Sequence, residues 1–159
     1  MNPDVNPDVS VTREIAAPAD AVWAMVADLT RMGEWSPENR GGKWLRGASG
    51  AQPGARFQGV NRNGSKQWKS VATMVDVEPG KRLAFRSSVL GIPIADWAYD
   101  LEPTATGCRV TESWTDRRPR WFLGLSARAS GVPDRTPYTR AGIEQTLERL
   151  AAAAEAAAS

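Results

Sequence analysis

The residue with the clearest capacity for chemistry is Glu112, which lies between Val110 and Trp114 in the segment CRVTESWTD (108–116). The segment has the alternating pattern of a β-strand, in which every second side chain shares a face. If Val110 and Trp114 point inward, Glu112 does too, and a buried carboxylate is costly unless it is paired or protonated. Glu112 therefore either pairs with a nearby arginine or lies in water at an open end, or it hydrogen-bonds a ligand head group or acts as an acid or base.

Tyr99 and Arg86 are further candidates for polarising a substrate carbonyl, but the rest of the composition restricts the chemistry. The sequence contains no histidine and one cysteine, Cys108. These counts exclude Ser-His-Asp and Cys-His catalysis, histidine-based metal sites and an internal disulfide. We find no glycine-rich phosphate loop or nucleotide fingerprint, so the sequence predicts neither a metal nor a cofactor.

The sequence predicts one domain that is preceded by a short leader. Residues 1–8 repeat the motif NPDV and are predicted to be disordered, and residues 9–159 are predicted to form a single ligand-binding domain. The formal net charge of +2 argues against a nucleic-acid-binding module, which needs a dense basic face. The polar start lacks the features of a secretory signal, and the single cysteine fits a reducing compartment, so we expect a cytoplasmic protein.

Hydrophobic periodicity predicts the elements that must position these side chains. In order, we expect a strand at 9–17, a helix at 18–29, a helical turn at 30–34, a meander of antiparallel strands between 40 and 115, an irregular or helical connection at 117–134, and a long helix that runs to residue 158. Thr136 and Pro137 are the predicted N-cap and first-turn proline of the long helix. The face of the strand at 67–78 that points inward stays open: Val71, Thr73, Val75 and Val77, or Ser70, Ala72 and Met74.

This order predicts an α+β fold. A curved antiparallel sheet of about six to seven strands wraps around the long C-terminal helix, with two short helices after the first strand. Such a sheet leaves a wedge-shaped space between itself and the helix, and a cavity there is the predicted binding site.

Several segments together resemble the START-like, helix-grip superfamily, and within it the polyketide cyclase/dehydrase and lipid-transport (SRPBCC) family in its small actinobacterial form. They are APADAVWAMVAD, DLTRMGEWSPE, SVATMVDVEPGKRLAF, GCRVTES and AGIEQTLERL, whose order and spacing match from about residue 9 to 157. The resemblance implies the helix-grip fold and a ligand cavity without naming a ligand. Some family enzymes use a cavity histidine, which this chain lacks, and this weakens the inference of catalysis.

The predicted cavity residues are mainly aromatic, since binding pockets are mostly apolar with a few orienting polar groups. Trp35 is predicted to cap the entrance beside Met32, because Ser36-Pro37 turns the chain away after a helical turn. Ordinary core packing is the alternative for any single tryptophan. The predicted ligand-binding residues are Trp35, Trp44, Phe57, Trp68, Met74, Phe85, Trp97, Tyr99, Glu112, Trp114, Ile143 and Leu147.

The sequence favours binding or carriage of a small hydrophobic molecule such as a lipid, an isoprenoid or a polyketide-like aromatic. The alternatives are a cofactor-independent polyketide cyclase, aromatase or dehydratase, and a protein-interaction domain like the chaperone activators or toxin-like members of the superfamily. The segment at 117–134 is predicted to be a lid, a solvated loop, or a weak contact with an anionic membrane surface. The residues for that contact are Arg117, Arg118, Arg120, Trp121 and Phe122.

Overall fold

The structure, a computed structural model, describes residues 6–159. The first five residues of the predicted leader lie outside the described residues. Its last residue, Asp8, accepts a hydrogen bond at 2.8 Å from the backbone N–H of Asp116. This contact attaches the start of the described chain to the end of the last strand.

One antiparallel sheet of seven strands forms the body of the molecule, in the spatial order β1-β7-β6-β5-β4-β3-β2. The strands are β1 (Val9–Ile15), β2 (Asn39–Trp44), β3 (Arg56–Asn63), β4 (Lys66–Glu78), β5 (Arg82–Val89), β6 (Ile92–Thr104) and β7 (Gly107–Asp116). From β2 to β7 each strand pairs with the next, as a meander requires, and β1 closes the row by pairing with β7. The predicted α+β architecture is confirmed.

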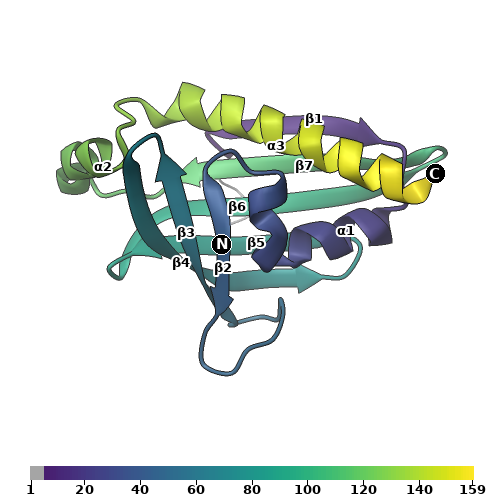
Figure 1. Cartoon of the computed structure of the whole chain (residues 1–159), viewed down its shortest axis with the longest axis horizontal. Coiled ribbons are helices and arrows are strands. Elements are labelled where there is room, and N and C mark those ends of the chain that lie inside the picture. The colour runs from purple at the N-terminus through teal and green to yellow at the C-terminus, as the bar shows by residue number, and fades with distance from the viewer. Residues whose placement is uncertain (1–5) are drawn as a thin grey trace.

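The helices lie on one face of this curved sheet (Figure 1). They are α1 (Ala19–Ala27), the 3-10 helix η1 (Leu29–Glu34), the 3-10 helix η2 (Arg120–Phe122), α2 (Leu123–Ser130) and α3 (Arg135–Ala158). Figure 1 shows α1 beside the C-terminal half of α3 and α2 at the opposite end of the molecule. Within residues 6–159, no helix combines the length and the apolar character that a bilayer crossing requires.

The start of the long helix differs by two residues from the prediction. The N-cap is Asp134, whose carboxylate accepts a hydrogen bond from the backbone N–H of Thr136. Thr136 is therefore inside the first turn and is not the cap. Before it, α2 ends at Gly131, which has φ of 71° and is the left-handed residue that commonly stops a helix. The predicted connection at 117–134 is thus helical over residues 120–130.

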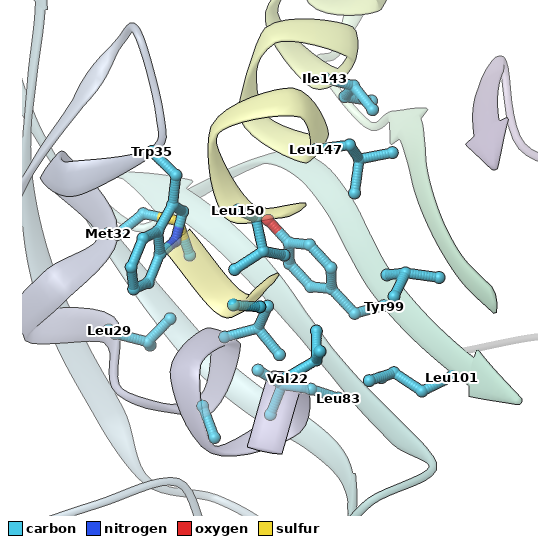
Figure 2. Packing of buried hydrophobic residues seen from close by; sticks show 14 of the residues in the cluster. Val22, Leu29, Met32, Trp35, Leu83, Tyr99, Leu101, Ile143, Leu147 and Leu150 are labelled. Carbon is cyan, nitrogen blue, oxygen red and sulfur yellow. The ribbon is translucent and has the colours of Figure 1, made fainter. Parts of the chain in front are cut away.

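The hydrophobic core fills the end of the molecule that holds α1. Figure 2 shows Val22, Leu83, Leu101, Leu147 and Leu150 packed between α1, the sheet and α3. All five are at most 3% exposed. The C-terminal half of α3 is therefore packed tightly against the sheet and α1, and any internal space must lie toward the N-terminal half.

A β-bulge in β4 settles which face of that strand points inward. The pairing with β5 runs from Met74↔Phe85 to Asp76↔Ala84, so Val75 is the extra residue. Before the bulge, Ala72 and Met74 are buried, whereas Val75 is 41% exposed. After it, Val77 packs against the core. Neither predicted face is inward along the whole strand, because the bulge exchanges the two sides.

Candidate functional site

A cavity of about 190 Å³ lies between the N-terminal half of α3 and the concave face of the sheet. Its walls are aromatic and aliphatic, and polar side chains gather where α2 and the segment before β2 meet α3. The α3 residues that border it are Arg135, Tyr138, Thr139, Gly142, Ile143 and Thr146. The wedge-shaped space predicted from the element order is therefore present, at one end of the long helix.

Eight of the twelve predicted ligand-binding residues border this cavity: Phe57, Trp68, Phe85, Trp97, Tyr99, Glu112, Trp114 and Ile143. Most of them come from β3 to β7, where alternate residues share the concave face. The cross-strand pairs Trp97↔Trp114 and Tyr99↔Glu112 bring four of these side chains together on neighbouring strands.

The other four predicted residues are not among those that line the cavity. Met74 and Leu147 are buried in the hydrophobic core. Trp44, on the edge strand β2, packs edge-to-face against Phe57 with ring centroids 5.2 Å apart. Trp44 thus supports a cavity wall from behind.

Trp35 corrects the expectation that its ring caps the entrance. The residue is 1% exposed, and Figure 2 shows its indole turned inward beside Met32 and Leu29. Because η1 is a 3-10 helix that ends at Glu34, the chain turns at Trp35 and directs the ring into the core. The guanidinium of Arg31 covers the ring at 5.2 Å from its centroid. Met32 and Pro37, its neighbours in the chain, border the cavity in its place.

Glu112 is the buried acidic group of the cavity wall. It is 3% exposed, and its Oε1 accepts a hydrogen bond of 2.9 Å from the hydroxyl of Tyr99. Its Oε2 has no hydrogen-bond partner among the described residues, and no arginine or lysine of residues 6–159 forms an ion pair with it. The simpler sequence-based interpretations, an arginine partner or a place in open water, are therefore wrong.

Burial decides the protonation of this pair. Burial raises the pKa of Glu112 to about 8, although the hydrogen bond from Tyr99 lowers it in part. Burial, with the neighbouring Glu112 carboxyl, also raises the pKa of Tyr99 well above its ordinary value. Near neutral pH the cavity wall therefore carries a mostly uncharged carboxylic acid held by an uncharged phenol.

Arg86, the third candidate for chemistry, lies on the opposite face of the sheet. Its guanidinium bonds both carboxylate oxygens of Asp96 at 2.6 and 2.9 Å, and Arg117 contacts the same carboxylate at 2.7 Å. Burial opposes ionisation of Asp96, but the two arginines outweigh it and hold the pKa of that carboxyl below its ordinary value. Arg86 is thus part of an outer-face ion-pair cluster and does not border the cavity.

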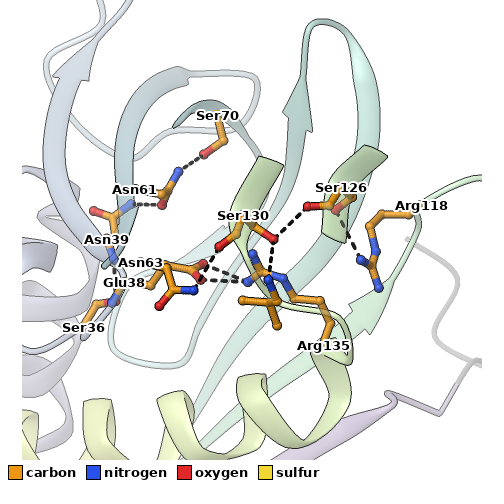
Figure 3. A network of polar contacts seen from close by, with 11 residues as sticks. Ser36, Glu38, Asn39, Asn61, Asn63, Ser70, Arg118, Ser126, Ser130 and Arg135 are labelled. Carbon is orange, nitrogen blue, oxygen red and sulfur yellow. Dashed lines mark hydrogen bonds and ion pairs between the residues drawn. The ribbon is translucent and has the colours of Figure 1, made fainter. Parts of the chain in front are cut away.

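A network of polar side chains surrounds the other end of the cavity (Figure 3). Arg135 donates to both carboxylate oxygens of Glu38 at 2.8 and 3.0 Å, and its guanidinium lies over the rings of Trp68 and Tyr138. These contacts fasten the start of α3 to the segment before β2. Arg118, also at this end, is bound to Asp116. Both arginines that border the cavity are therefore matched by carboxylates.

Amides continue this network along the sheet. Asn39 donates to Asn61 at 3.2 Å, and Asn61 donates to the hydroxyl of Ser70 at 2.9 Å. All three residues border the cavity. Ser70 belongs to one of the two inward faces predicted for the strand at 67–78, whereas Asn39 and Asn61 were not among the predicted residues. Strand alternation could have identified Asn61, because it lies four residues after the predicted wall residue Phe57 and therefore on the same face of the strand. Arg135 had no such signal, since it precedes the predicted helix start.

The segment predicted as a lid or membrane contact divides between two roles. Phe122 of η2 and Ser126, Ala129 and Ser130 of α2 border the cavity. Arg117 and Arg118 are held in ion pairs with carboxylates. Trp121 is 66% exposed and Leu125 58%, so η2 and α2 present large apolar side chains to solvent.

Solved structures similar to this chain share its fold. The Polyketide_cyc-like protein Cgl2372 of Corynebacterium glutamicum is 29% identical, with 90% of this chain and 88% of that one covered and a TM-score of 0.60. The protein TTHA0849 of Thermus thermophilus is 18% identical, with 95% and 99% covered and a TM-score of 0.69. The di-domain ARO/CYC StfQ from the steffimycin biosynthetic pathway is 15% identical, with a TM-score of 0.72; 94% of this chain aligns to 51% of it.

Sequence comparison assigns the family. No curated protein sequence gives a significant match to the chain. The family model described as polyketide cyclase / dehydrase and lipid transport matches residues 6–155, nearly the whole chain. The resemblance of the helix, hairpin and strand motifs is therefore confirmed: this chain belongs to the polyketide cyclase / dehydrase and lipid transport family.

Proposed function

We propose that the protein binds or carries a small hydrophobic molecule in the cavity under α3. The observation that carries this proposal is a space of about 190 Å³ walled by aromatic side chains from the five strands β3 to β7 and from the helices η2 and α3. A dry apolar cavity of about 150 Å³ binds benzene-sized guests, and pockets for drug-sized ligands begin near 300 Å³. The enclosed part of the ligand is therefore about one or two rings in size, and a longer molecule would extend past α2.

Native mass spectrometry of the purified protein, followed by extraction of bound material, tests this proposal. A co-purifying hydrophobic compound that is released on denaturation would support carriage. Protein that is free of such a compound and fails to bind any apolar one- or two-ring probe would contradict it.

An enzymatic role is the alternative that one specific observation favours. A carboxyl group whose pKa is raised to about 8 can act as a general acid or base near neutral pH, and Glu112 borders the cavity with Tyr99 as its positioning partner. In that case Glu112 would transfer a proton to or from an enolisable ketone, as cyclisation and dehydration of a poly-β-ketone require. Exchange of α-hydrogens for deuterium, catalysed by the native protein and lost in Glu112→Gln, would favour the enzyme; no exchange with a bound ketone would favour carriage.

We further propose that η2 and α2 touch an anionic membrane surface and so admit ligand from it. Trp121, Leu123 and Leu125 are exposed apolar side chains on the solvent side of these helices. Arg120 and Arg128 flank them, are exposed, and form no ion pair within the part of the chain that the structure describes. Apolar side chains between free cations match the charge and chemistry of an anionic lipid surface.

A further inference from the structure

One carboxyl oxygen at the cavity wall has no partner. Glu112 Oε1 accepts the hydrogen bond from Tyr99, and Oε2 accepts or donates none among the described residues. A buried polar atom without a partner loses its hydrogen bonds to water without compensation, so native structures seldom retain one without a reason. Glu112 borders the cavity, and a ligand bound there offers a partner for its carboxyl group.

The hydrogen bond from Tyr99 determines whether Oε2 can donate or accept a hydrogen bond. In a neutral carboxylic acid the carbonyl oxygen accepts hydrogen bonds better than the hydroxyl oxygen. Oε1, which accepts from the Tyr99 phenol, therefore acts as the carbonyl oxygen, and the acid proton resides on Oε2. In that form Oε2 is a hydrogen-bond donor, and ionised it is an acceptor only. A ligand oxygen that accepts a hydrogen bond, such as a ketone or hydroxyl oxygen, is therefore the matching group.

The charges around the cavity leave no free cation for an anionic ligand. The other titratable or charged side chains that border it are Tyr99 from β6, Glu38 before β2, Arg118 after β7, and Arg135 and Tyr138 from α3. Glu38 and Arg135 bind each other, and Arg118 binds Asp116. On β1, the residue opposite Glu112 is Val11, which carries no charge. A carboxylate or phosphate next to Glu112 would be buried without compensation.

We propose that the Glu112 end of the cavity selects an uncharged, flat molecule of one or two rings that carries a ketone or hydroxyl oxygen, and that Glu112 hydrogen-bonds this oxygen while Tyr99 positions the carboxyl. This inference rests on the proposed ligand-binding function. It adds the chemical class of the ligand and the atom that recognises it. The aromatic walls formed by Trp97 and Trp114 favour a flat guest over a flexible chain.

Calorimetric titration with two matched probes tests the inference. 1-Tetralone and tetralin have the same two-ring frame, but only tetralone carries a ketone oxygen. At about pH 6 we expect native protein to bind tetralone about 3- to 10-fold more tightly than tetralin, as one net hydrogen bond allows. The preference should vanish near pH 9.5, where ionised Glu112 cannot donate.

Three variants test whether the Glu112 carboxyl group causes the preference for tetralone. Glu112→Gln retains a donor that does not titrate, so its preference for tetralone should persist at both pH values. Glu112→Leu should bind the two probes equally. Tyr99→Phe removes a hydrogen bond that lowers the pKa of Glu112, so the pH at which the preference disappears should rise. A purely structural role for Tyr99 would leave that midpoint unchanged.

The outcomes separate this inference from the proposed function. Equal binding of tetralone and tetralin by native protein, or a tetralone preference that survives in Glu112→Leu, would overturn the role of Glu112 and leave hydrophobic binding intact. Failure of every variant and of native protein to bind either probe would overturn both proposals.

Discussion

Replacing Glu112 by glutamine should stabilise the protein, and more so as the pH rises. The substitution keeps the shape of the side chain and an oxygen that accepts the hydrogen bond from Tyr99. It removes the proton equilibrium. In native protein the carboxyl group has a pKa of about 8, against 4.5 for the same group in water. The folded state therefore holds a proton that the unfolded state releases above pH 4.5.

The sign and size of the effect follow from this difference. Because the folded pKa is raised, the contribution of Glu112 to stability is fully retained below about pH 4.5 and is lost as the pH rises toward 8. Each pH unit in that interval costs ~1.4 kcal/mol, so the loss at pH 7 is roughly 3 kcal/mol. The glutamine variant avoids this loss. For a chain of this length the difference corresponds to about 6–12 °C in melting temperature.

Urea denaturation followed by tryptophan fluorescence measures the difference. Native protein and Glu112→Gln should unfold at similar urea concentrations near pH 4.5, and the variant should be more stable by roughly 3 kcal/mol near pH 7. Glu148→Gln is the matched control, because it makes the same substitution at an exposed position on α3. If Glu112→Gln were as stable as native protein at every pH, or less stable near pH 7, the account of a buried, protonated Glu112 would be refuted.

Three further predictions concern other parts of the structure. Asp96→Asn, at the outer-face ion-pair cluster, should lower the free energy of unfolding by about 1–3 kcal/mol near pH 7, less than for a fully buried pair because both arginines reach solvent. Since the pKa of Asp96 is lowered by folding, urea titrations should show this deficit shrinking as the pH falls below about 4. Arg135→Lys keeps the charge but loses the planar guanidinium that lies over Trp68 and Tyr138; stopped-flow fluorescence should show several-fold faster probe dissociation, and an unchanged rate would show that these contacts of Arg135 do not control ligand exit. In flotation with vesicles that contain phosphatidylserine, native protein should bind in low salt and Trp121→Ala/Leu125→Ala should bind less; equal flotation of both would contradict the membrane proposal, whereas a purely protein-binding surface predicts none.

The fold and most cavity walls could be predicted because strand alternation is a strict rule. The inward set on β5, β6 and β7 follows from a period of two, and every predicted aromatic on these strands borders the cavity. The same rule failed on β4, where the bulge at Val75 exchanges the faces. A bulge inserts one residue into the alternation, and no residue type near Val75 marks the position.

The depth of a residue along the cavity could not be predicted. Helical periodicity places Ile143 and Leu147 on one stripe of α3, yet Ile143 borders the cavity and Leu147 packs in the core. Periodicity identifies the buried face of a helix. It does not show where along this face the sheet moves away from the helix, because that position depends on the packing of α1 and of the whole sheet. The hydrogen-bond partner of Glu112 could not be predicted for a similar reason. Tyr99 lies opposite Glu112 only in the observed register of β6 and β7, which the sequence alone does not specify.

The most direct test of ligand binding in this cavity is calorimetric titration of tetralin into native protein and into Ser87→Phe. Ser87 of β5 borders the cavity, so the added ring would fill the space, and Ser88→Phe places the same ring on the other side of β5 as a control. We predict one bound tetralin per chain for native protein and Ser88→Phe, and at least about tenfold weaker binding for Ser87→Phe. Absence of binding by native protein, or equal binding by Ser87→Phe, would contradict the assignment of the cavity as the ligand site.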